Sequence, residues 1–265
     1  MAFFTSLTCA LVSGAETTTT PEGVPAYQFK AINAACNPGV PVILMVDSTS
    51  ENGKFLAALG EKAAGGEAIR VFVSGILQPV LAEKLEDKSI SKPPKVIVYV
   101  GGVRRMRADT KLDPEQFQVF GSGFITAQTD YEDSTKRKPA VFVSSGTESM
   151  QKEGVYCSRL DLIGDKNSST EEPLMQTEDG TEVYFMGNLY RSAGTYNESS
   201  YDKLKVNCTF VQATDRVKQR KAGGRNKPAS MTSQLDASFE ESESTAQTLT
   251  PEALSAQAAV SLSDF

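Results

Sequence analysis

Lysine, arginine and tyrosine side chains carry the most informative chemistry in this sequence. A cation can neutralise a phosphate and a flat ring can stack on a base, so together they suit a ligand that carries both negative charge and rings. The expected stacking residues of the first half of the chain are Tyr27 and Tyr99. The cations expected to take part are Lys30, Arg70, Arg104, Arg105, Arg107, Lys136, Arg137 and Lys138, the last three on a loop after Tyr131.

Two details qualify these expectations. Phe29 and Phe72 are expected in the core, and Lys30 then points outward because neighbours on a strand face opposite sides. Arg105 and Arg107 are expected on one side of a strand exit, although a solvated strand end that keeps a sheet soluble would show the same residues.

The residue types that catalysis and metal binding require are scarce. The chain has no histidine, which removes the commonest general base and the commonest metal ligand. The four cysteines, at positions 9, 36, 157 and 208, form no CxxC pair and are expected to act as small buried hydrophobic groups. No phosphate-binding or dinucleotide-binding glycine motif is found. We therefore expect no metal, no cofactor and no enzymatic activity.

The elements that would position these side chains follow in a defined order. Apolar strand patterns occupy residues 7–14, 26–33 and 40–46, a helical segment occupies 53–62, and further strands occupy 68–77 and 95–103. Three strands, one helix and two strands is the order of an OB-fold barrel.

The amino-acid sequence of this region resembles that of the bacterial single-stranded-DNA-binding protein family. The resemblance rests on five stretches taken in order, which are Leu11–Gly14, Thr20–Asn33, Val42–Ser48, Gly53–Gly66 and Ile69–Gln78. They reproduce a strand ending in Gly, a Thr-Pro-x-Gly turn, a Phe-containing strand, a helix rich in Leu and Ala, and a Val-x-Val-x-Gly-x-Leu strand. The chain departs from the family in having no Trp, the family's chief stacking residue. Tyr156 lies near a position where the family has a stacking Trp, so the resemblance implies that Tyr156 stacks on a base.

A second set of strand patterns repeats the first after about one hundred residues. Its strands are expected at 117–127, 140–144, 155–164, 182–189 and 203–211, and residues 165–180 are expected to form a loop without a helix. Val183 and Gly187 match the spacing of Val71 and Gly75. The sequence thus predicts an all-β protein with two tandem OB-fold domains at 1–112 and 113–215. One large irregular β sandwich is the alternative.

The two predicted domains differ in net charge. Residues 1–112 hold 12 Lys and Arg against 10 Asp and Glu, whereas residues 113–215 hold 9 against 17. The first domain is therefore the better candidate for a polyanion. Residues 216–265 begin with a basic run and continue with few apolar groups, so they are expected to form a disordered tail. The resemblance implies that its tip, Asp264 and Phe265, binds partner proteins.

The resemblance also implies a function. A member of this family would bind single-stranded DNA without catalysis, during replication, repair or recombination, as a cytoplasmic, nucleoid-associated dimer whose chains carry two OB domains each. The alternative is an OB-like structural or protein-interaction module, such as a phage or assembly component. The net charge of −6 and the absence of Trp favour that alternative.

Overall fold

The computed structural model describes residues 3–20, 22–85, 89–107, 115–129, 137–143, 158–164, 169–178, 180–196 and 199–217. For residues 126–129, 137–143, 158–159, 196, 199 and 217 the description covers the backbone alone. The tail predicted at 216–265 lies outside the described residues, apart from its first two positions.

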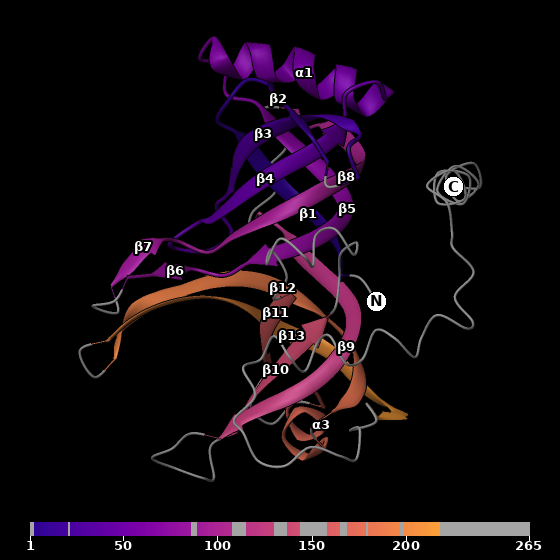
Figure 1. The fold of residues 1–265 in the computed structure, drawn as a ribbon, viewed down its shortest axis with the longest axis vertical. Coiled ribbons are helices and arrows are strands. Elements are labelled where there is room, and N and C mark those ends of the chain that lie inside the picture. Colours follow the sequence, from indigo (N-terminus) through magenta and orange to yellow (C-terminus); the bar gives the residue numbers. More distant parts are fainter. Residues whose placement is uncertain are drawn as a thin grey trace. The chain divides into compact units, whose positions relative to one another are not determined.

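The first barrel is built from the N-terminal elements, coloured indigo to magenta in Figure 1. In chain order they are β1 (Phe3–Leu11), β2 (Glu16–Thr19), β3 (Pro25–Asn33), β4 (Val40–Asp47), α1 (Glu51–Ala64), β5 (Arg70–Val80), β6 (Glu83–Lys84), β7 (Ile90–Lys92) and β8 (Lys95–Arg105). Five strands close on one another in the order β1, β3, β4, β8, β5 and back to β1. The β4–β8 pair is parallel, the others are antiparallel, and α1 lies between the third and fourth barrel strands. This is the OB topology that the sequence predicts.

The second barrel repeats this arrangement. Its elements are β9 (Phe117–Thr129), β10 (Arg137–Val143), β11 (Ser158–Gly164), α3 (Glu171–Gln176), β12 (Thr181–Tyr196) and β13 (Ser199–Val217). They close in the order β9, β10, β11, β13, β12 and back to β9, with a parallel β11–β13 pair. The helix α3 corrects the expectation of a loop at 165–180. Six residues with a Pro in the third position give too short a helical pattern to detect in the sequence.

One glycine in each barrel explains the repeated sequence pattern. Gly75 lies at a register shift between β5 and β8, and Gly187 lies at the matching shift between β12 and β13. A Cβ at Gly75 would stand 2.1 Å from the Tyr99 carbonyl oxygen, and one at Gly187 would stand 2.2 Å from the Asn207 oxygen. The bulge brings two backbones so close that only glycine fits.

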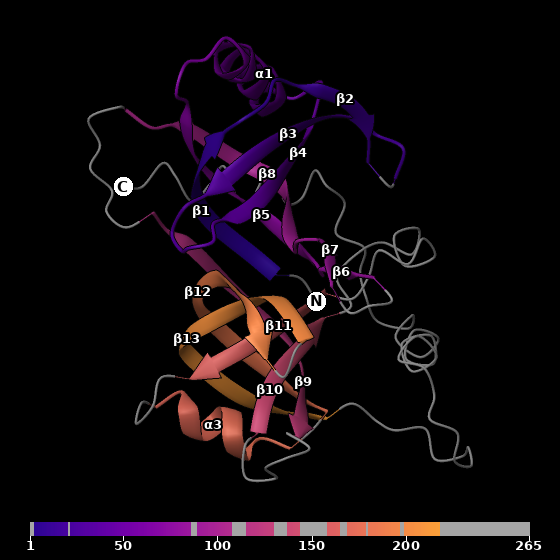
Figure 2. The same cartoon turned by 90° about the vertical axis from the view of Figure 1, so that its left-hand side faces the viewer.

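The two barrels share one hydrogen-bonded sheet. Strand β1 pairs antiparallel with β9, with Phe3 opposite Gly121 and Leu7 opposite Phe117, and eleven strands join into a single sheet. Figure 2 shows β1 continuing toward β9 where the two barrels meet. The chain through Lys218 forms one compact unit, so the barrels are fused through their first strands.

Alternating burial along the strands produces one hydrophobic core that extends through both barrels. Phe3 of β1 meets Phe185 of β12 edge to face, with ring centroids 5.6 Å apart. In the first barrel, α1 covers Phe29, whose ring would lie 2.8 Å from a Cβ at Gly60, so glycine lets the helix approach closely. Ser50 caps this helix by accepting a hydrogen bond from the Gly53 backbone N–H at 3.0 Å.

The cysteines behave largely as the sequence predicts. Cys9 and Cys208 are free and buried, and burial raises the pKa of each thiol to about 12. Cys36 is free and half-buried, and Cys157 lies outside the described residues.

Candidate nucleic-acid interface

An outward-facing aromatic ring lies beside a free cation on the first barrel. Val71 and Val73 of β5 are buried, so Phe72 between them faces outward and is half-buried. Its Cα partners are Arg104 on β8 and Thr8 on β1. Arg104 is exposed, and no ion pair holds it within the described part of the chain. The expectation that Phe72 lies in the core is therefore corrected, because its strand neighbours occupy the inward side.

The other predicted cations of the first barrel are mostly paired. Lys30 lies 2.7 Å from Glu16, Arg70 lies 2.8 Å from Glu115, and Arg105 pairs with Glu67. Lys30 faces outward opposite the buried Phe29, as predicted. The Lys30–Glu16 and Arg105–Glu67 pairs are about half-exposed and contribute about 0–1 kcal/mol each, so a phosphate can replace the carboxylate at little cost, whereas Glu115 is only 14% exposed.

Arg107 follows the end of β8 and is exposed, without an ion pair among the described residues. Because β8 ends at Arg105, strand alternation does not extend to Arg107. Arg104 and Arg107 are thus the predicted cations most available to a polyanion.

The two predicted tyrosines of the first barrel make protein contacts. Tyr27 packs edge-on against Phe29, with centroids 6.3 Å apart, and is partly buried on the core. The Tyr99 hydroxyl donates a hydrogen bond to Gln78 Oε1 at 3.1 Å on the outer side of the barrel. Neither ring presents a free face as readily as Phe72.

Several predicted site residues cannot be placed as side chains. Lys136, Tyr156, Asp264 and Phe265 lie outside the described residues, and the side chains of Arg137 and Lys138 do as well. The backbone of Arg137 and Lys138 belongs to β10, which corrects the expectation that these residues lie on a loop.

The second barrel carries an equivalent of Phe72 that the sequence analysis did not select. Tyr184 lies three residues before Gly187, as Phe72 lies three residues before Gly75, and 51% of Tyr184 is exposed. Its Cα partners are Ser122 and Gln212, so no formal charge adjoins it in the sheet. The repeated Val-x-x-x-Gly spacing in the sequence could have identified Tyr184 as the equivalent of Phe72.

A second aromatic and basic surface lies on the β12–β13 hairpin. Asp202, Leu204 and Val206 are buried, which turns the alternate residues of β13 outward. These are Tyr201, Lys203 and Lys205, with Tyr190 of β12 opposite Lys205. The Lys205 Nζ lies 5.9 Å from the Tyr201 ring centroid, and the Lys203 Nζ lies 3.7 Å from Asp161. We call these four residues the hairpin face.

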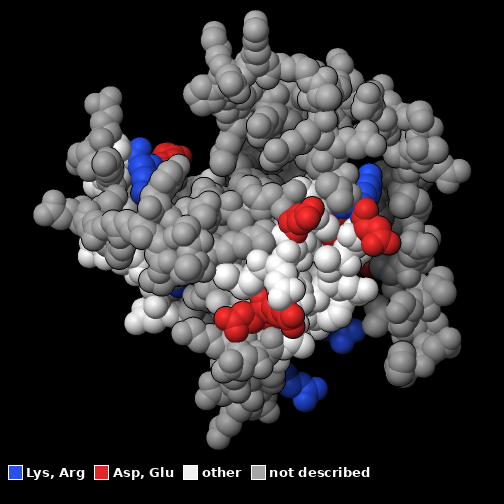
Figure 3. Space-filling view, turned by 90° about the horizontal axis from the view of Figure 1, so that it is seen from below, with Lys and Arg blue, Asp and Glu red and all other residues white. Residues whose placement is uncertain are grey.

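The hairpin face is a basic surface within a region whose net charge is acidic. Residues 113–215 are acidic in sum, and the view from below in Figure 3 shows both acidic and basic groups on the described surface. The helix at that end of the barrel, α3, contributes Glu171 and Glu172. The lysines of β13 lie on a different element, so barrel topology separates the two signs of charge.

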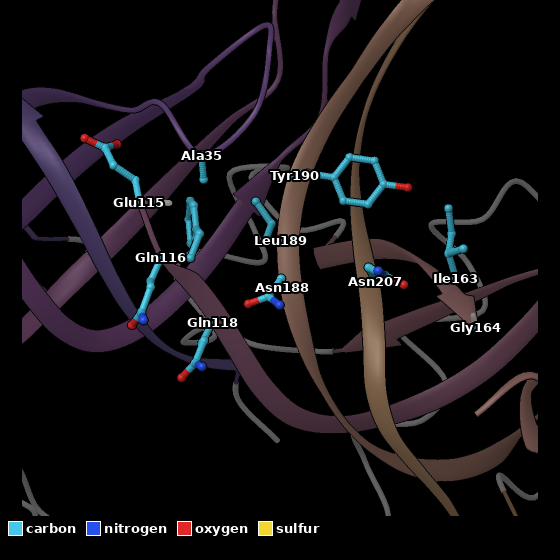
Figure 4. A pocket seen from close by; sticks show the side chains of 11 residues that line it. Ala35, Glu115, Gln116, Gln118, Ile163, Gly164, Asn188, Leu189, Tyr190 and Asn207 are labelled. Atoms are coloured by element: carbon cyan, nitrogen blue, oxygen red, sulfur yellow. The ribbon is translucent and has the colours of Figure 1, made fainter. Parts of the chain in front are cut away.

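A groove lies at the junction of the two barrels, next to the hairpin face. Its volume is about 820 Å³, and Figure 4 shows side chains from β9, β11, β12 and β13 around it. We call it the junction groove. The polar residues that carry its hydrogen-bonding capacity are Gln116, Gln118, Asn188, Asn207 and Tyr190. Burial, and then the charge of Asp161, raise the pKa of Tyr190, so its hydroxyl stays protonated at neutral pH.

Exposed apolar side chains form a row across the shared sheet. Phe4, Phe120, Met186 and Phe210 are successive Cα partners on β1, β9, β12 and β13, and we call them the apolar row. Their exposed fractions lie between 37% and 48%. The rings of Phe4 and Phe120 stack, with centroids 5.5 Å apart and planes 15° apart. Sequence alternation places them outward, but only the β1–β9 pairing brings them together.

The described residues contain no group of three or more His, Cys, Asp or Glu side chains that could hold a metal ion. None of the helices in the described ranges has the length and apolar character needed to cross a membrane.

Strand order and strand pairing define the chain as an all-β protein of two OB barrels. No protein-family model and no curated protein matches the sequence. Among solved structures, the chain is similar to the wild-type single-stranded DNA binding protein from Thermus aquaticus, with 13% identity and a TM-score of 0.46, over 84% of this chain and 98% of that chain. A deletion mutant of the same protein gives 11% identity and a TM-score of 0.48, over 83% of this chain and 98% of that one.

Proposed function

We propose that this chain binds single-stranded DNA without catalysing a reaction. The observation that carries the proposal is the outward aromatic residue at the same position of each barrel. Phe72 lies beside Arg104, which has no ion pair among the residues that the structure describes, and Tyr184 takes the same position in the second barrel. Rings of this kind stack on bases, and neighbouring cations neutralise phosphates. The sequence resemblance and the name of the Thermus aquaticus protein point the same way.

The binding mechanism follows from where the charges lie. Arg104 and Arg107 contact phosphates directly, Lys30 and Arg105 exchange their carboxylate partners for phosphates, and Arg70 stays a predicted contact that keeps its pairing with Glu115. The hairpin face supplies a second set of rings and cations, Tyr190, Tyr201, Lys203 and Lys205. Bound counterions are released in the process, so affinity falls as salt rises.

Other parts of the proposal rest on the resemblance. We infer separate binding units at 1–112 and 113–215, followed by a tail at 216–265 whose tip, Asp264 and Phe265, recruits replication or repair proteins. Lys136, Arg137, Lys138 and Tyr156 stay predicted DNA contacts of the second unit, and Tyr27 and Tyr99 stay predicted contacts of the first. A cytoplasmic, nucleoid-associated location is part of the same proposal.

The test is fluorescence anisotropy of a labelled oligo-dT at low and moderate salt, beside a duplex of the same length. Tight binding of the single strand that weakens with salt supports the function. Changing Arg104→Ala and Arg107→Ala together removes two phosphate contacts, so the slope of log affinity against log salt falls by about 1.4. The matched control changes Lys54 and Lys62, exposed cations of α1, and leaves the slope unchanged. Absence of binding at low salt refutes the proposal.

The apolar row favours an interaction between protein chains as well. With roughly 200 Å² for each side chain, its four exposed fractions leave about 350 Å² of apolar surface. The largest apolar patch on a typical monomer covers about 300–600 Å² and is often a functional surface, and a standard interface buries about 800 Å² per partner. Its neighbours along β1, β9 and β12 in the adjoining cross-strand row are Ser6, Gln118 and Asn188, which carry no charge to attract phosphates.

We infer that a second copy of the chain covers the apolar row, giving a dimer with four barrels. Sedimentation velocity without DNA tests this. The wild type should sediment as a dimer, and changing Phe120→Ser with Met186→Ser should give a monomer. The control, Leu81→Ser, removes an exposed apolar group outside the row. If the wild type is still monomeric at about 10 µM, its dissociation constant lies above about that value. That result contradicts the inference.

A further inference from the structure

The junction groove holds four side-chain amides with unused hydrogen-bonding capacity. Gln116 and Gln118 come from β9 or the residue before it, Asn188 from β12 and Asn207 from β13. In the part of the chain that the structure describes, none of these amides hydrogen-bonds to another protein group through its side chain. Each amide offers two donors and an acceptor with two lone pairs. The groove therefore presents several free donors and acceptors to one ligand.

The strand registers bring three of these amides into line. Gln118 is the Cα partner of Asn188, and Asn188 is the partner of Asn207, so the amides cross three strands side by side. Ile163 of β11 is the next partner and closes the row with an apolar wall. Figure 4 shows these side chains and Tyr190 around the groove.

The far wall of the groove is held by a rigid set of polar contacts. Asn33, which is fully buried, donates from Nδ2 to the Thr8 carbonyl at 2.7 Å and to the Gln116 carbonyl at 3.1 Å. The Arg191 guanidinium donates a hydrogen bond to the Gly39 carbonyl at 3.2 Å and two further hydrogen bonds to the Asp202 carboxylate. The loop that carries Ala35 is thus tied to both barrels, and the groove is formed before a ligand arrives.

The charge of the groove selects a neutral ligand. Glu115 is the sole charged residue among the described lining residues, and its carboxylate already accepts from Arg70 and from the Ala34 backbone N–H. The described lining contains no cation, so it offers little to hold a phosphate. Lys205 and Lys203 lie just outside it, on the hairpin face, where the phosphates of the same strand would pass.

We propose that the junction groove binds a nucleobase of the single strand by its hydrogen-bonding edge, so that this protein discriminates between bases. Primary amides match such edges, since one amide donates and accepts at the same time. Tyr190 forms the side of the site nearest the lysines and offers a ring for stacking. The proposal rests on the proposed function, because it assumes that a single strand reaches the groove.

Homopolymers of dA, dC and dT, twelve residues long, test the proposal by anisotropy at one salt concentration. The wild type should prefer one of them by about fivefold, the lower limit expected of an amide reading a base edge. Changing Asn188→Ala with Asn207→Ala should abolish the preference by weakening the preferred homopolymer. Both residues are exposed, so the fold is retained, which circular dichroism verifies. The control Gln176→Ala removes an exposed amide of α3 and should keep the preference.

An abasic strand of the same length separates base from backbone contacts. Wild type and double variant should bind it equally, because it has no base edge. Equal wild-type affinity for all three homopolymers overturns the base-reading site but leaves single-strand binding intact. A preference that survives in the double variant, or an equal loss on the abasic strand, also overturns it. No binding of any strand refutes the proposed function itself.

Discussion

Replacement of Phe72 by Leu separates stacking from every other contribution to binding. Leucine keeps an apolar side chain of similar volume against Thr8, so the free energy of unfolding should fall by less than about 1.5 kcal/mol. The π-face is lost. Because Phe72 is half-buried and presents one face, we take the lower end of the stacking range, about 1 kcal/mol, which is about fivefold in affinity.

The same change at Tyr184 should cost a similar factor, and the double variant should lose about 25-fold. The two residues lie on different barrels, so their effects should multiply. Neither change removes a cation. The slope of log affinity against log salt should therefore equal that of the wild type, in contrast to the arginine variants.

Anisotropy titrations of labelled oligo-dT at four salt concentrations measure both quantities. Phe55→Leu is the matched control, since Phe55 is an exposed aromatic residue of α1 with 41% exposure, away from β5. The reasoning is refuted if Phe72→Leu binds within about 1.5-fold of the control, a factor well below one stacked base, or if the salt slope changes.

Three further outcomes concern the scaffold. Gly75→Ala should lower the free energy of unfolding, measured in urea, by at least about 3 kcal/mol, because the new Cβ would meet the Tyr99 carbonyl oxygen. The control is Gly101→Ala at the same bulge. There the nearest atom lies 3.8 Å from the new Cβ, so the change should cost less than about 1 kcal/mol. Asp202→Asn should cost about 3 kcal/mol, because it removes the charge that balances a guanidinium only 16% exposed, whereas the exposed Asp215→Asn should be neutral. In a Cys157→Ser background, a thiol reagent at pH 8 should label Cys36 alone, because burial raises the pKa of Cys9 and Cys208 from 9.0 to about 12. The folded pKa of these thiols exceeds the unfolded value, so their stabilising contribution is complete below pH 9 and declines as pH rises toward 12.

Local patterns predicted much of the fold. The five strands and the helix of the first barrel lie close to their expected positions, with the helix at 51–64 rather than 53–62. The repeated glycine was the most dependable signal, because the bulge at Gly75 and Gly187 excludes any side chain. Elements with weak periodicity were missed, such as β2 and α3, and β12 and β13 extend well beyond the apolar runs that predicted them.

Predictions about single side chains were less successful. Phe72 was assigned to the core from its residue type, although Val71 and Val73 on either side already indicated that it faces outward. Net charge hid the lysines of β13, because a sum over one hundred residues cannot show which strand carries which charge. Tyr27 stays a predicted contact of a ligand, and its ring packs edge-on against Phe29.

By itself, the sequence determined which residues form strands, which side of each strand faces the core, and where glycine is obligatory, since these depend on neighbours within a few positions. The tertiary structure decided which strands pair across more than one hundred residues. Pairing of β1 with β9 places Phe4 on Phe120, and pairing of β9, β12 and β13 aligns Gln118, Asn188 and Asn207. Those contacts join segments whose separation no local pattern encodes, so the apolar row and the junction groove exist only in the folded chain.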